Sequence, residues 1–356
     1  MKAFVLEQKG QAHVCECPEP ELTDEYSAIL TPVALSPCTS DVNTVYYSKT
    51  PRNGLILGHE CVARIVKTGS KVRDFNVGDK VAVPAITPDY RHVDVGRSGA
   101  HAGKPFSGNA LGRSVPGVCA EYFEVKDADR QLAKIPEGVS DEAALMCVDM
   151  MSTGFTGAEA AEIKPDDTVL VIGIGAVGLM AIAAAKLMGA GRIIAVGSRK
   201  SSVELALKYG ADEVIDYKKD DYVEKTLSET GGRGADEVII CGGGDDVMAR
   251  AIEAVRYGGG IVVNLKLFGG DGDISFGKFA SGRGLGGKTI KMELCRGGRE
   301  WTEKLLGFIE EGKIDPSRLI TLKLEGFSNI EKALELMKDK SDDMIKVMVV
   351  PEWKEA

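Results

Sequence analysis

The sequence has no cluster of lysine and arginine dense enough to follow a nucleic-acid backbone. Its 356 residues carry a formal net charge of -9, and this acidic balance disfavours polyanionic partners. The first ten residues, MKAFVLEQKG, lack an apolar run long enough for a secretory signal. We therefore expect a cytoplasmic protein whose partners are small molecules, with no nucleic acid and no membrane among them.

Long uncharged stretches are also scarce. One runs from Val169 to Ala185, at the low edge of the roughly 17–25 residues that span a bilayer. Three glycines interrupt it, and Lys186 follows directly. Because glycines at such positions are typical of a turn between a strand and a helix, the membrane-spanning alternative is disfavoured.

The eight cysteines include no C-x-x-C pair and no tight group of four. A zinc ribbon needs such spacing, and a disulfide scaffold needs a denser framework, so neither is predicted. In a reducing compartment most of these cysteines should be small buried hydrophobes. We expect at most one or two of them to have a chemical role.

What the sequence contains changes in character along the chain. Up to about residue 150, short β-branched runs such as CVARIVKTGS and VGDKVAV alternate with turns, which predicts an antiparallel, barrel-like domain. The Gly, Ser and Pro content of 86–118 indicates a long functional loop. From about 166, strands alternate with helices, and near-continuous Val and Ile runs predict a doubly wound parallel sheet. The fold class is therefore α/β, and from about 295 two helices and a last strand, IKVMVV, follow the sheet.

The run VLVIGIGAVGLM predicts a dinucleotide site. Gly173, Gly175 and Gly178 have the spacing G-x-G-x-x-G, directly after a strand and at the start of a helix. The first makes a tight turn, the second lets the backbone approach a pyrophosphate, and the third lets the helix pack closely on the strand. Ala176 and Val177 complete this turn. A closely packed helix without a ligand is the alternative.

The end of the second strand of this sheet favours NADP(H) over NAD(H). Gly197 stands where an NAD site would carry a carboxylate for the ribose hydroxyls. Ser198 and Arg199 follow, and hydroxyl and guanidinium groups are good donors to a 2′-phosphate. A solvated loop would also favour these residue types, but the missing acid favours NADP(H).

Two fragments of the first domain suggest a metal site. Cys38 lies in SPCTSD and His59 in LGHE, 21 residues apart. A single cysteine or histidine usually has a structural role. Together, in a domain that precedes a nucleotide fold, a thiolate and an imidazole suit Zn²⁺.

The motifs SPCTSD, GHE, VGDKV, DMMSTGF, VIGIGAVGLM and AVGSR together resemble the zinc-dependent medium-chain alcohol dehydrogenases, and within them most closely the NADP-dependent secondary alcohol dehydrogenases. The similarity follows the chain in order over nearly its whole length. It implies a GroES-like catalytic domain over 1–152, completed by a C-terminal segment over 295–356. It also implies a Rossmann domain over 153–294, an active site in the cleft between the domains, and a homotetramer.

This resemblance implies the metal ligands residue by residue. Cys38, His59 and Asp149 match zinc ligands, and Glu60 matches a neighbouring carboxylate that can join or leave the metal. Cys147 is an alternative to Asp149, but the number of residues between the ligand and the following Thr153-Gly154 pair favours Asp149. Many members also hold a structural zinc on four closely spaced cysteines, and 86–118 contains none. We therefore expect one catalytic zinc per subunit and no structural zinc.

The resemblance also assigns the proton path and the nicotinamide contact. Ser40 matches the hydroxyl that hands the substrate proton onward, and Thr153 matches a residue beside the nicotinamide. Asn43 stands where the family usually continues this relay with a histidine. Since asparagine does not titrate near neutral pH, either Asp41 and water carry the proton outward or the relay is truncated.

The remaining implied residues line two pockets. Ser198, Arg199 and Tyr217 match the 2′-phosphate pocket, and Lys340 is a weaker candidate. In the substrate pocket, two aromatic residues of close relatives are replaced, and we expect a wider pocket with a cation near its mouth. The substrate-pocket residues are Ala85, Ile86 and Cys295, which look retained, and Lys104 and Leu267, which replace the aromatics.

The function implied is a zinc-dependent oxidoreductase that transfers a hydride between NADP(H) and a small secondary alcohol or ketone. The altered pocket leaves open a dehydrogenase for polyols, amino-alcohols or bulkier carbonyls. A nucleotide-binding protein without catalysis is a further alternative. The three implied zinc ligands, Cys38, His59 and Asp149, count against it, because a protein without catalysis needs no zinc.

Overall fold

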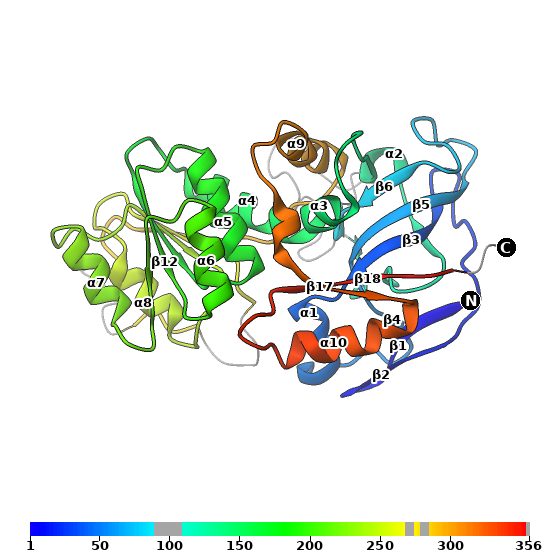
Figure 1. Ribbon diagram of the computed structural model, residues 1–356, viewed down its shortest axis with the longest axis horizontal. Coiled ribbons are helices and arrows are strands. Elements are labelled where there is room, and N and C mark those ends of the chain that lie inside the picture. The colour runs from blue at the N-terminus through cyan, green and yellow to red at the C-terminus, as the bar shows by residue number, and fades with distance from the viewer. Residues whose placement is uncertain (89–108, 268–273, 278–284, 354–356) are drawn as a thin grey trace. The chain divides into compact units, whose positions relative to one another are not determined.

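The computed structural model describes residues 1–88, 109–267, 274–277 and 285–353. The chain divides into two compact units, which are described separately below. Unit 1 comprises Met1–Ser152 and Cys295–Ala356, and unit 2 comprises Thr153–Leu294 (Figure 1). Lys104 lies outside the described residues.

Unit 1 is built around a seven-stranded, mostly antiparallel sheet. The predicted strands CVARIVKTGS and VGDKVAV correspond to β5 (Glu60–Thr68) and β6 (Lys80–Val83), which pair antiparallel. The last strand of the chain, β18 (Lys346–Val350), lies between β3 and β17, so the C-terminal segment completes this sheet. The other strands are β3 (Ala28–Ser36), β9 (Phe123–Val125), β10 (Ala133–Lys134) and β17 (Ile320–Glu325).

The rest of unit 1 consists of two small sheets and short helices. The sheets contain β1 (Lys2–Gln8), β2 (Gln11–Glu16) and β4 (Leu55–Ile56), and β7 (Ile86–Thr87) with β8 (Asn109–Ala110). The helices described are α1 (Thr39–Val42), α2 (Ala128–Gln131), α3 (Asp141–Met146), α9 (Arg299–Glu310) and α10 (Ile330–Lys338). Single π-helical turns cover Asn43–Tyr47 and Cys147–Met151, and 3-10 turns cover Pro316–Leu319 and Phe327–Asn329.

Helix α10 shows how the sequence pattern positions these elements. Its residues Ile330, Ala333, Leu334 and Met337 are buried, and their i, i+3, i+4, i+7 spacing places them on one face. They join the core formed by β1, β3, β5 and β18. The apolar stripe therefore fixes the helix against the sheet that carries the candidate metal ligands.

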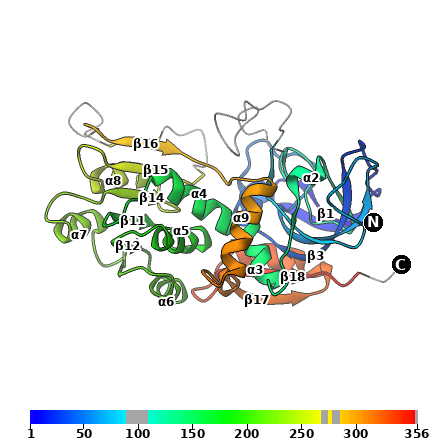
Figure 2. The same cartoon turned by 90° about the horizontal axis from the view of Figure 1, so that it is seen from above.

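Unit 2 contains a six-stranded parallel sheet in the order β13-β12-β11-β14-β15-β16, which confirms the predicted doubly wound fold. Figure 2 follows this order from β16 through β15, β14 and β11 to β12. The strands are β11 (Thr168–Ile172), β12 (Arg192–Val196), β13 (Glu213–Ile215), β14 (Glu237–Ile240), β15 (Ile261–Asn264) and β16 (Thr289–Met292).

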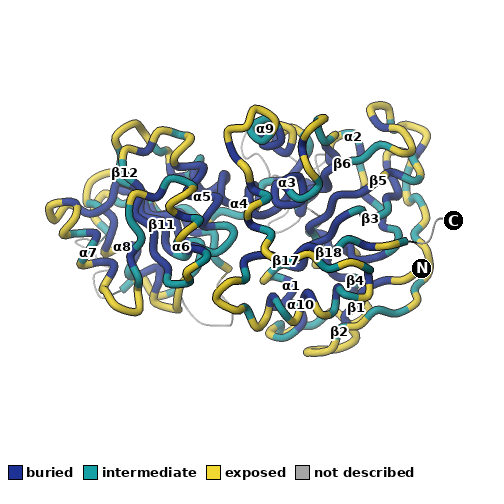
Figure 3. Tube along the Cα trace, viewed as in Figure 1, coloured by how far each residue is buried: buried dark blue, intermediate teal, exposed yellow. Residues whose placement is uncertain are grey.

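The central strands of this sheet are buried on both faces, as their continuous Val and Ile runs predict (Figure 3). Helices α5 and α6 contact each other as well as β11, β12 and β13, while α8 contacts α7, β14 and β15. The helices are α4 (Ser152–Ala161), α5 (Ala176–Leu187), α6 (Lys200–Lys208), α7 (Tyr222–Glu229) and α8 (Val247–Ala254).

The uncharged run from Val169 to Ala185 is therefore a strand, a glycine turn and most of helix α5. None of the described helices is both long and apolar enough to cross a membrane.

Candidate metal centre and nucleotide turn

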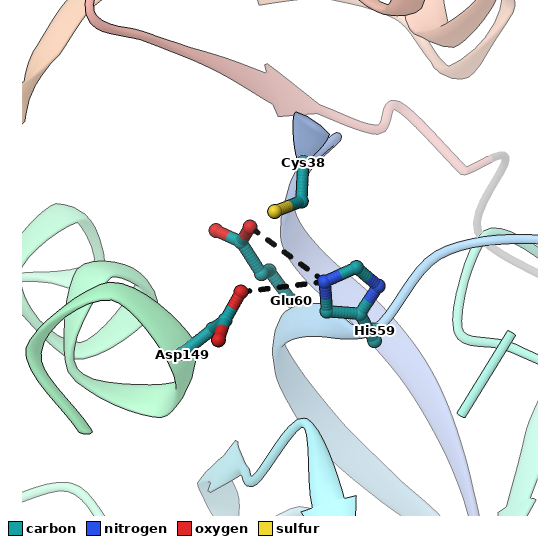
Figure 4. A group of neighbouring side chains, drawn as sticks. All are labelled: Cys38, His59, Glu60 and Asp149. Atoms are coloured by element: carbon teal, nitrogen blue, oxygen red, sulfur yellow. Dashed lines mark ion pairs between the residues drawn. The ribbon is translucent and has the colours of Figure 1, made fainter. Parts of the chain in front are cut away.

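Four side chains of unit 1 converge, and their ligand atoms all lie within 4.8 Å of one another (Figure 4). They come from three places in the chain. Cys38 directly precedes α1, His59 and Glu60 stand at the start of β5, and Asp149 lies in the π-helical turn after α3. The strand start and the two turns thus bring together one thiol, one imidazole and two carboxyl groups.

The turn that carries Cys38 is held by Asp41. The Cys38 backbone N–H donates to Asp41 Oδ2 at 2.8 Å, which ties the first turn of α1 together. The other oxygen, Asp41 Oδ1, lies 3.3 Å from His59 Nδ1. One buried carboxylate therefore positions both the thiol and the imidazole.

The His59 ring is oriented with its second nitrogen toward the other donors. Nε2 lies 3.3 Å from Asp149 Oδ2 and 3.2 Å from Ser40 Oγ. Burial opposes a positive charge on the ring, but the carboxylates of Asp41 and Asp149 outweigh it and hold the His59 pKa well above its usual value. The surroundings of the ring, Asp41 at Nδ1 and Asp149 at Nε2, therefore favour positive charge.

Glu60 is buried with only one of its oxygens satisfied. Oε1 accepts a hydrogen bond from Lys346 Nζ at 2.6 Å, and Lys346 also donates to the Pro37 carbonyl at 2.9 Å. Oε2 has no partner among the described residues. Burial raises the Glu60 pKa to about 7, against the opposing charge of Lys346.

These donors fit a zinc ion. Thiolate, imidazole and carboxylate are zinc ligands, with bonds of about 2.0–2.3 Å that place tetrahedral ligand atoms about 3.3–3.8 Å apart. The four ligand atoms lie within 4.8 Å of one another, which is compatible with this geometry. The unpartnered oxygen of Glu60 offers a further ligand. In the described part of the chain, no other group of three or more His, Cys, Asp or Glu side chains meets this distance condition.

The rival ligand Cys147 is not part of the group. Its side chain is fully buried in the core, and burial raises the pKa of its thiol far above the usual range. Residues two apart on a helical turn point in different directions, so only one of Cys147 and Asp149 can face the other donors. The turn is π-helical, a local widening that is frequent at functional sites.

The predicted proton carriers lie around this group. Ser40 is in α1 beside His59, and Asn43 begins the next π-helical turn with an exposed side chain. Asp41 is almost fully buried between the Cys38 backbone and His59, so it is not open to solvent. Thr153 is a buried residue of α4 in unit 2.

Ala85 and Cys295 both contact the segment that bears Asp149. The Ala85 N–H donates to the Val148 carbonyl at 3.3 Å, and Cys295 Sγ lies 3.4 Å from Ser152 Oγ. Ile86 starts β7 next to Ala85. Leu267, in contrast, belongs to unit 2 and is 42% exposed.

The glycine turn of unit 2 has the geometry that a dinucleotide site needs. Gly173 has φ of +93°, and a Cβ there would lie 2.7 Å from the Gly242 nitrogen. A Cβ at Gly178 would lie 1.9 Å from the Gly173 carbonyl oxygen, so close packing of α5 on β11 requires glycine. At Gly175 no atom lies within 4 Å of the Cβ position, and this open space faces the start of α5.

The candidate 2′-phosphate residues follow the neighbouring strands. Ser198 and Arg199 come after β12 and are half-buried, and Tyr217 comes after β13 and is 55% exposed. Because β11, β12 and β13 are adjacent and parallel, the turns at their carboxyl ends share one edge of the sheet. Lys340 belongs to unit 1, where its Nζ lies 3.1 Å from Thr39 Oγ1.

Gly197 lies close to the side chain of Ile174. A Cβ at this position would lie 2.0 Å from Ile174 Cγ1, because the residue after β12 packs on the glycine turn. A carboxylate at this position would therefore require the Ile174 side chain to shift.

Two contacts were not predicted from the sequence. They are the contact of Asp41 with His59 Nδ1 and the ion pair of Lys346 with Glu60. The spacing of Cys38 and Asp41, three residues apart, was a local signal for the capped turn at Cys38 but not for the contact with His59. A lysine within the apolar run IKVMVV was a signal for the second, because a lysine is almost never fully buried without a partner.

Comparison with known proteins assigns both parts of the chain to the same family. A family model for the alcohol dehydrogenase GroES-like domain matches residues 25–137, and a model for zinc-binding dehydrogenases matches residues 176–311. An NADP-dependent isopropanol dehydrogenase of Thermoanaerobacter brockii is 45% identical over 352 residues, covering 98% of this chain and 99% of the relative. One from Clostridium beijerinckii is 44% identical over 93% of this chain and 95% of the relative.

Solved structures agree with this assignment. An alcohol dehydrogenase from Thermus sp. ATN1 superposes with a TM-score of 0.89 at 27% identity, covering 99% of this chain and all of that one. A zinc-dependent alcohol dehydrogenase from Streptococcus pneumonia, in its apo form, gives a TM-score of 0.89 at 26% identity over the full length of both.

Proposed function

Because this chain belongs to the family of zinc-binding alcohol dehydrogenases, we propose that it transfers a hydride between NADP(H) and a small secondary alcohol or its ketone. The observation that carries this proposal is the group formed by Cys38, His59, Glu60 and Asp149, in a chain that also has the glycine turn of a dinucleotide site. The relatives named as NADP-dependent isopropanol dehydrogenases support the substrate class and the choice of cofactor.

In this proposal Cys38, His59 and Asp149 would hold one zinc ion, and Glu60 is the neighbouring carboxylate that could join them. The metal supplies Lewis acidity, which lowers the pKa of a substrate hydroxyl and polarises a ketone oxygen. Asp41 holds the His59 ring through Nδ1, so that Nε2 points toward Asp149 and the other ligands. Lys346 binds one oxygen of Glu60 and leaves the other oxygen without a hydrogen-bond partner beside the other ligand atoms.

Ser40 takes the proton that a substrate hydroxyl loses. Its Oγ lies 3.2 Å from His59 Nε2, within the group of donors. Beyond Ser40 the proton passes to water, because Asp41 is occupied by His59 and Asn43 does not titrate near neutral pH. This route differs from a relay that ends on a histidine.

Ser198 and Arg199 bind the 2′-phosphate of NADP(H), with Tyr217 beside them. Their position at the shared edge of β11, β12 and β13 supports this role. A charge-assisted hydrogen bond from a guanidinium to a phosphate favours NADP(H), and Gly197 lacks the carboxylate that would favour NAD(H). Thr153 contacts the nicotinamide, and Lys340 is a weaker phosphate contact.

Three further properties belong to the same proposal. We propose one zinc per chain, supported by the single donor group in the described residues. We propose a homotetramer on the family resemblance, and the edge strand β16, where Met292 is 54% exposed, is a surface that favours pairing of two chains. We propose a cytoplasmic location, supported by eight cysteines that are all free.

Replacement of Cys38 tests the zinc role. In Cys38→Ala we expect zinc content and turnover both to collapse while NADPH binding survives, since the glycine turn belongs to unit 2. The matched control is Cys147→Ala, which removes a buried thiol outside the donor group and should retain zinc. Metal analysis, initial rates and a fluorescence titration with NADPH measure the three properties. Turnover retained by Cys38→Ala would refute the zinc role.

A further inference from the structure

Two cysteines outside the metal centre lie side by side at the end of strand β2. Cys15 Sγ and Cys17 Sγ are 3.9 Å apart. Residues at i and i+2 of a strand share one face, and here the strand ends between them, at Glu16. Neither thiol is used by the proposed reaction, and neither is in a disulfide.

A third sulfur lies on the same face. Met1 stands directly opposite Cys17, because the Cys17 N–H donates to the Met1 carbonyl and the Met1 nitrogen donates to the Cys17 carbonyl, both at 2.8 Å. Directly opposed residues have Cβ atoms about 4.5–5.5 Å apart. The Met1 side chain is only 3% exposed, and it packs with Cys15 and Cys17 on the small cluster of Ala3, Val5 and Ala120. Two thiols and a thioether thus share one small, half-buried site beside the N-terminus.

The charges around this site are of both signs, because the Met1 α-ammonium lies 3.5 Å from Glu16 Oε2, but acidic residues predominate in the segment that begins at Glu16. Residues 16–25, ECPEPELTDE, contain five acidic residues and neither lysine nor arginine. Burial raises the pKa of the Cys15 thiol, and the neighbouring Cys17 and the carboxylates of Glu16 and Glu7 raise it further. Negative charge disfavours a free thiolate, which is the form that oxidants attack, but it stabilises a thiolate bound to a positive ion.

We propose that Cys15, Cys17 and Met1 form a binding site for monovalent copper. Thiolate and thioether ligands select Cu(I) over harder metals. Thiolate sulfurs bonded to one metal at about 2.3 Å lie about 4 Å apart in a trigonal arrangement, so the observed 3.9 Å needs no movement of the strand. A disulfide would require the sulfurs to approach to about 2.05 Å.

Binding is balanced by proton release. One Cu(I) replaces the protons of the two thiols, two protons leave to solvent, and no electron is transferred. The donor set differs from that of the first centre, which has one thiol, one imidazole and two carboxyl groups and no thioether. The two sites therefore share no residue and prefer different metals.

A competition titration tests the proposal. The zinc-loaded protein is titrated without oxygen with Cu(I), supplied as its acetonitrile complex, against the coloured chelator bicinchoninate. The wild type should take one equivalent of Cu(I) from the chelator. Cys15→Ser combined with Cys17→Ser should bind it at least about tenfold more weakly, a loss of about 1.4 kcal/mol. Lys9→Ala, an exposed change in the turn before β2, should bind like the wild type, and zinc content and turnover should stay unchanged in all three.

A second measurement on the unaltered chain does not depend on how the variants fold. Copper X-ray absorption of selenomethionine protein should give two sulfur neighbours and one selenium neighbour. Three results would overturn the proposal: unchanged affinity in the double variant, a copper environment without selenium, or release of zinc as copper binds. A mass lower by two hydrogens in the peptide that holds Cys15 and Cys17, from protein purified in air, would also overturn it in favour of a disulfide.

Discussion

At the scale of single residues, the metal centre depends on side chains that are not ligands. Asp41 joins the Cys38 backbone to His59, and Lys346 holds one oxygen of Glu60. Burying the Lys346–Glu60 pair costs several kcal/mol of desolvation per ion, which good geometry only partly recovers. Its value here is positional, because it leaves the second oxygen of Glu60 beside the other donors.

The cofactor preference is also decided by two residues. In Ser198→Asp combined with Arg199→Ala, NADPH binding should weaken by at least about tenfold relative to NADH, because charge-assisted hydrogen bonds are worth about 1.5–3 kcal/mol each. A new carboxylate would also repel the 2′-phosphate. Dissociation constants for both cofactors, measured by fluorescence, provide the comparison.

The control for that variant is Lys208→Ala, which removes a positive charge from the opposite end of α6. It should leave the ratio of the two dissociation constants unchanged. If the double variant also keeps the wild-type ratio, the phosphate contacts of Ser198 and Arg199 do not exist.

The sequence indicates the ligand types at this scale but not the residues that support them. Cys38 and His59 stand out as a thiol and an imidazole ahead of a nucleotide fold, and family resemblance adds Asp149. The pairing of Lys346 with Glu60 joins positions 286 residues apart. The lysine within IKVMVV indicates that a buried partner is needed, but no local pattern identifies Glu60 as that partner.

At the scale of elements, the glycine turn between β11 and α5 has two different requirements. Gly178 and Gly173 are needed because the chain comes too close for a side chain, while Gly175 leaves space that a phosphate can occupy. The same residue type thus serves packing at one position and binding at another.

Two alanine substitutions separate these requirements. Gly178→Ala should lower the free energy of unfolding by about 1–3 kcal/mol, because its Cβ would meet the Gly173 carbonyl and force α5 away from β11. Gly175→Ala should change stability by less than about 0.5 kcal/mol but weaken NADPH binding, because its Cβ fills the open space. Urea unfolding and NADPH titration measure both. Equal stability of the two variants would contradict this division.

Strand β14 begins with a buried acid that links the stability of unit 2 to pH. Burial, followed by the carboxylates of Asp167 and Asp236, raises the Glu237 pKa to about 8, and Arg256 opposes this shift. A folded pKa above the unfolded value of about 4.3 means that the proton stabilises the fold at low pH. That stabilisation is lost as pH rises toward 8.

This link is tested with Glu237→Gln, because the glutamine side chain has the same shape as that of glutamate and cannot ionise. Between about pH 5 and pH 8, wild-type unfolding free energy should fall relative to this variant, by at most about 1.4 kcal/mol per pH unit for one proton. Glu204→Gln, an exposed change on α6, should follow the wild type. Parallel curves for wild type and Glu237→Gln would show that Glu237 is ionised in the fold.

Most elements of unit 2 are predicted by their patterns, and β16 is the exception. Strands β11, β12, β14 and β15 are continuous apolar runs, which a parallel sheet buried on both faces requires. Strand β16 is a short edge strand with no fully buried residue. Its membership of the sheet is set by pairing with β15, which no local pattern reports.

At the scale of the whole molecule, the chain forms two units with different architectures, and the C-terminal segment returns to the first. Strand β18 inserts beside β3 and supplies Lys346 to the metal centre, so the centre is incomplete until the last strand is in place. The change from antiparallel to parallel patterns along the sequence predicts the fold class. The pocket residue Lys104 lies outside the described residues, so pocket width stays a prediction.

The central claim is hydride transfer between NADP(H) and small secondary alcohols or ketones. Its most direct test is the initial rate of NADPH oxidation by the zinc-loaded protein across a panel of small ketones, bulky carbonyls, keto acids and keto sugars, repeated with NADH. We predict the highest kcat/KM for small aliphatic ketones with NADPH, and a rate with NADH lower by at least about tenfold, the effect of about 1.4 kcal/mol. No oxidation of NADPH by any small ketone, or an equal rate with NADH, would contradict the account.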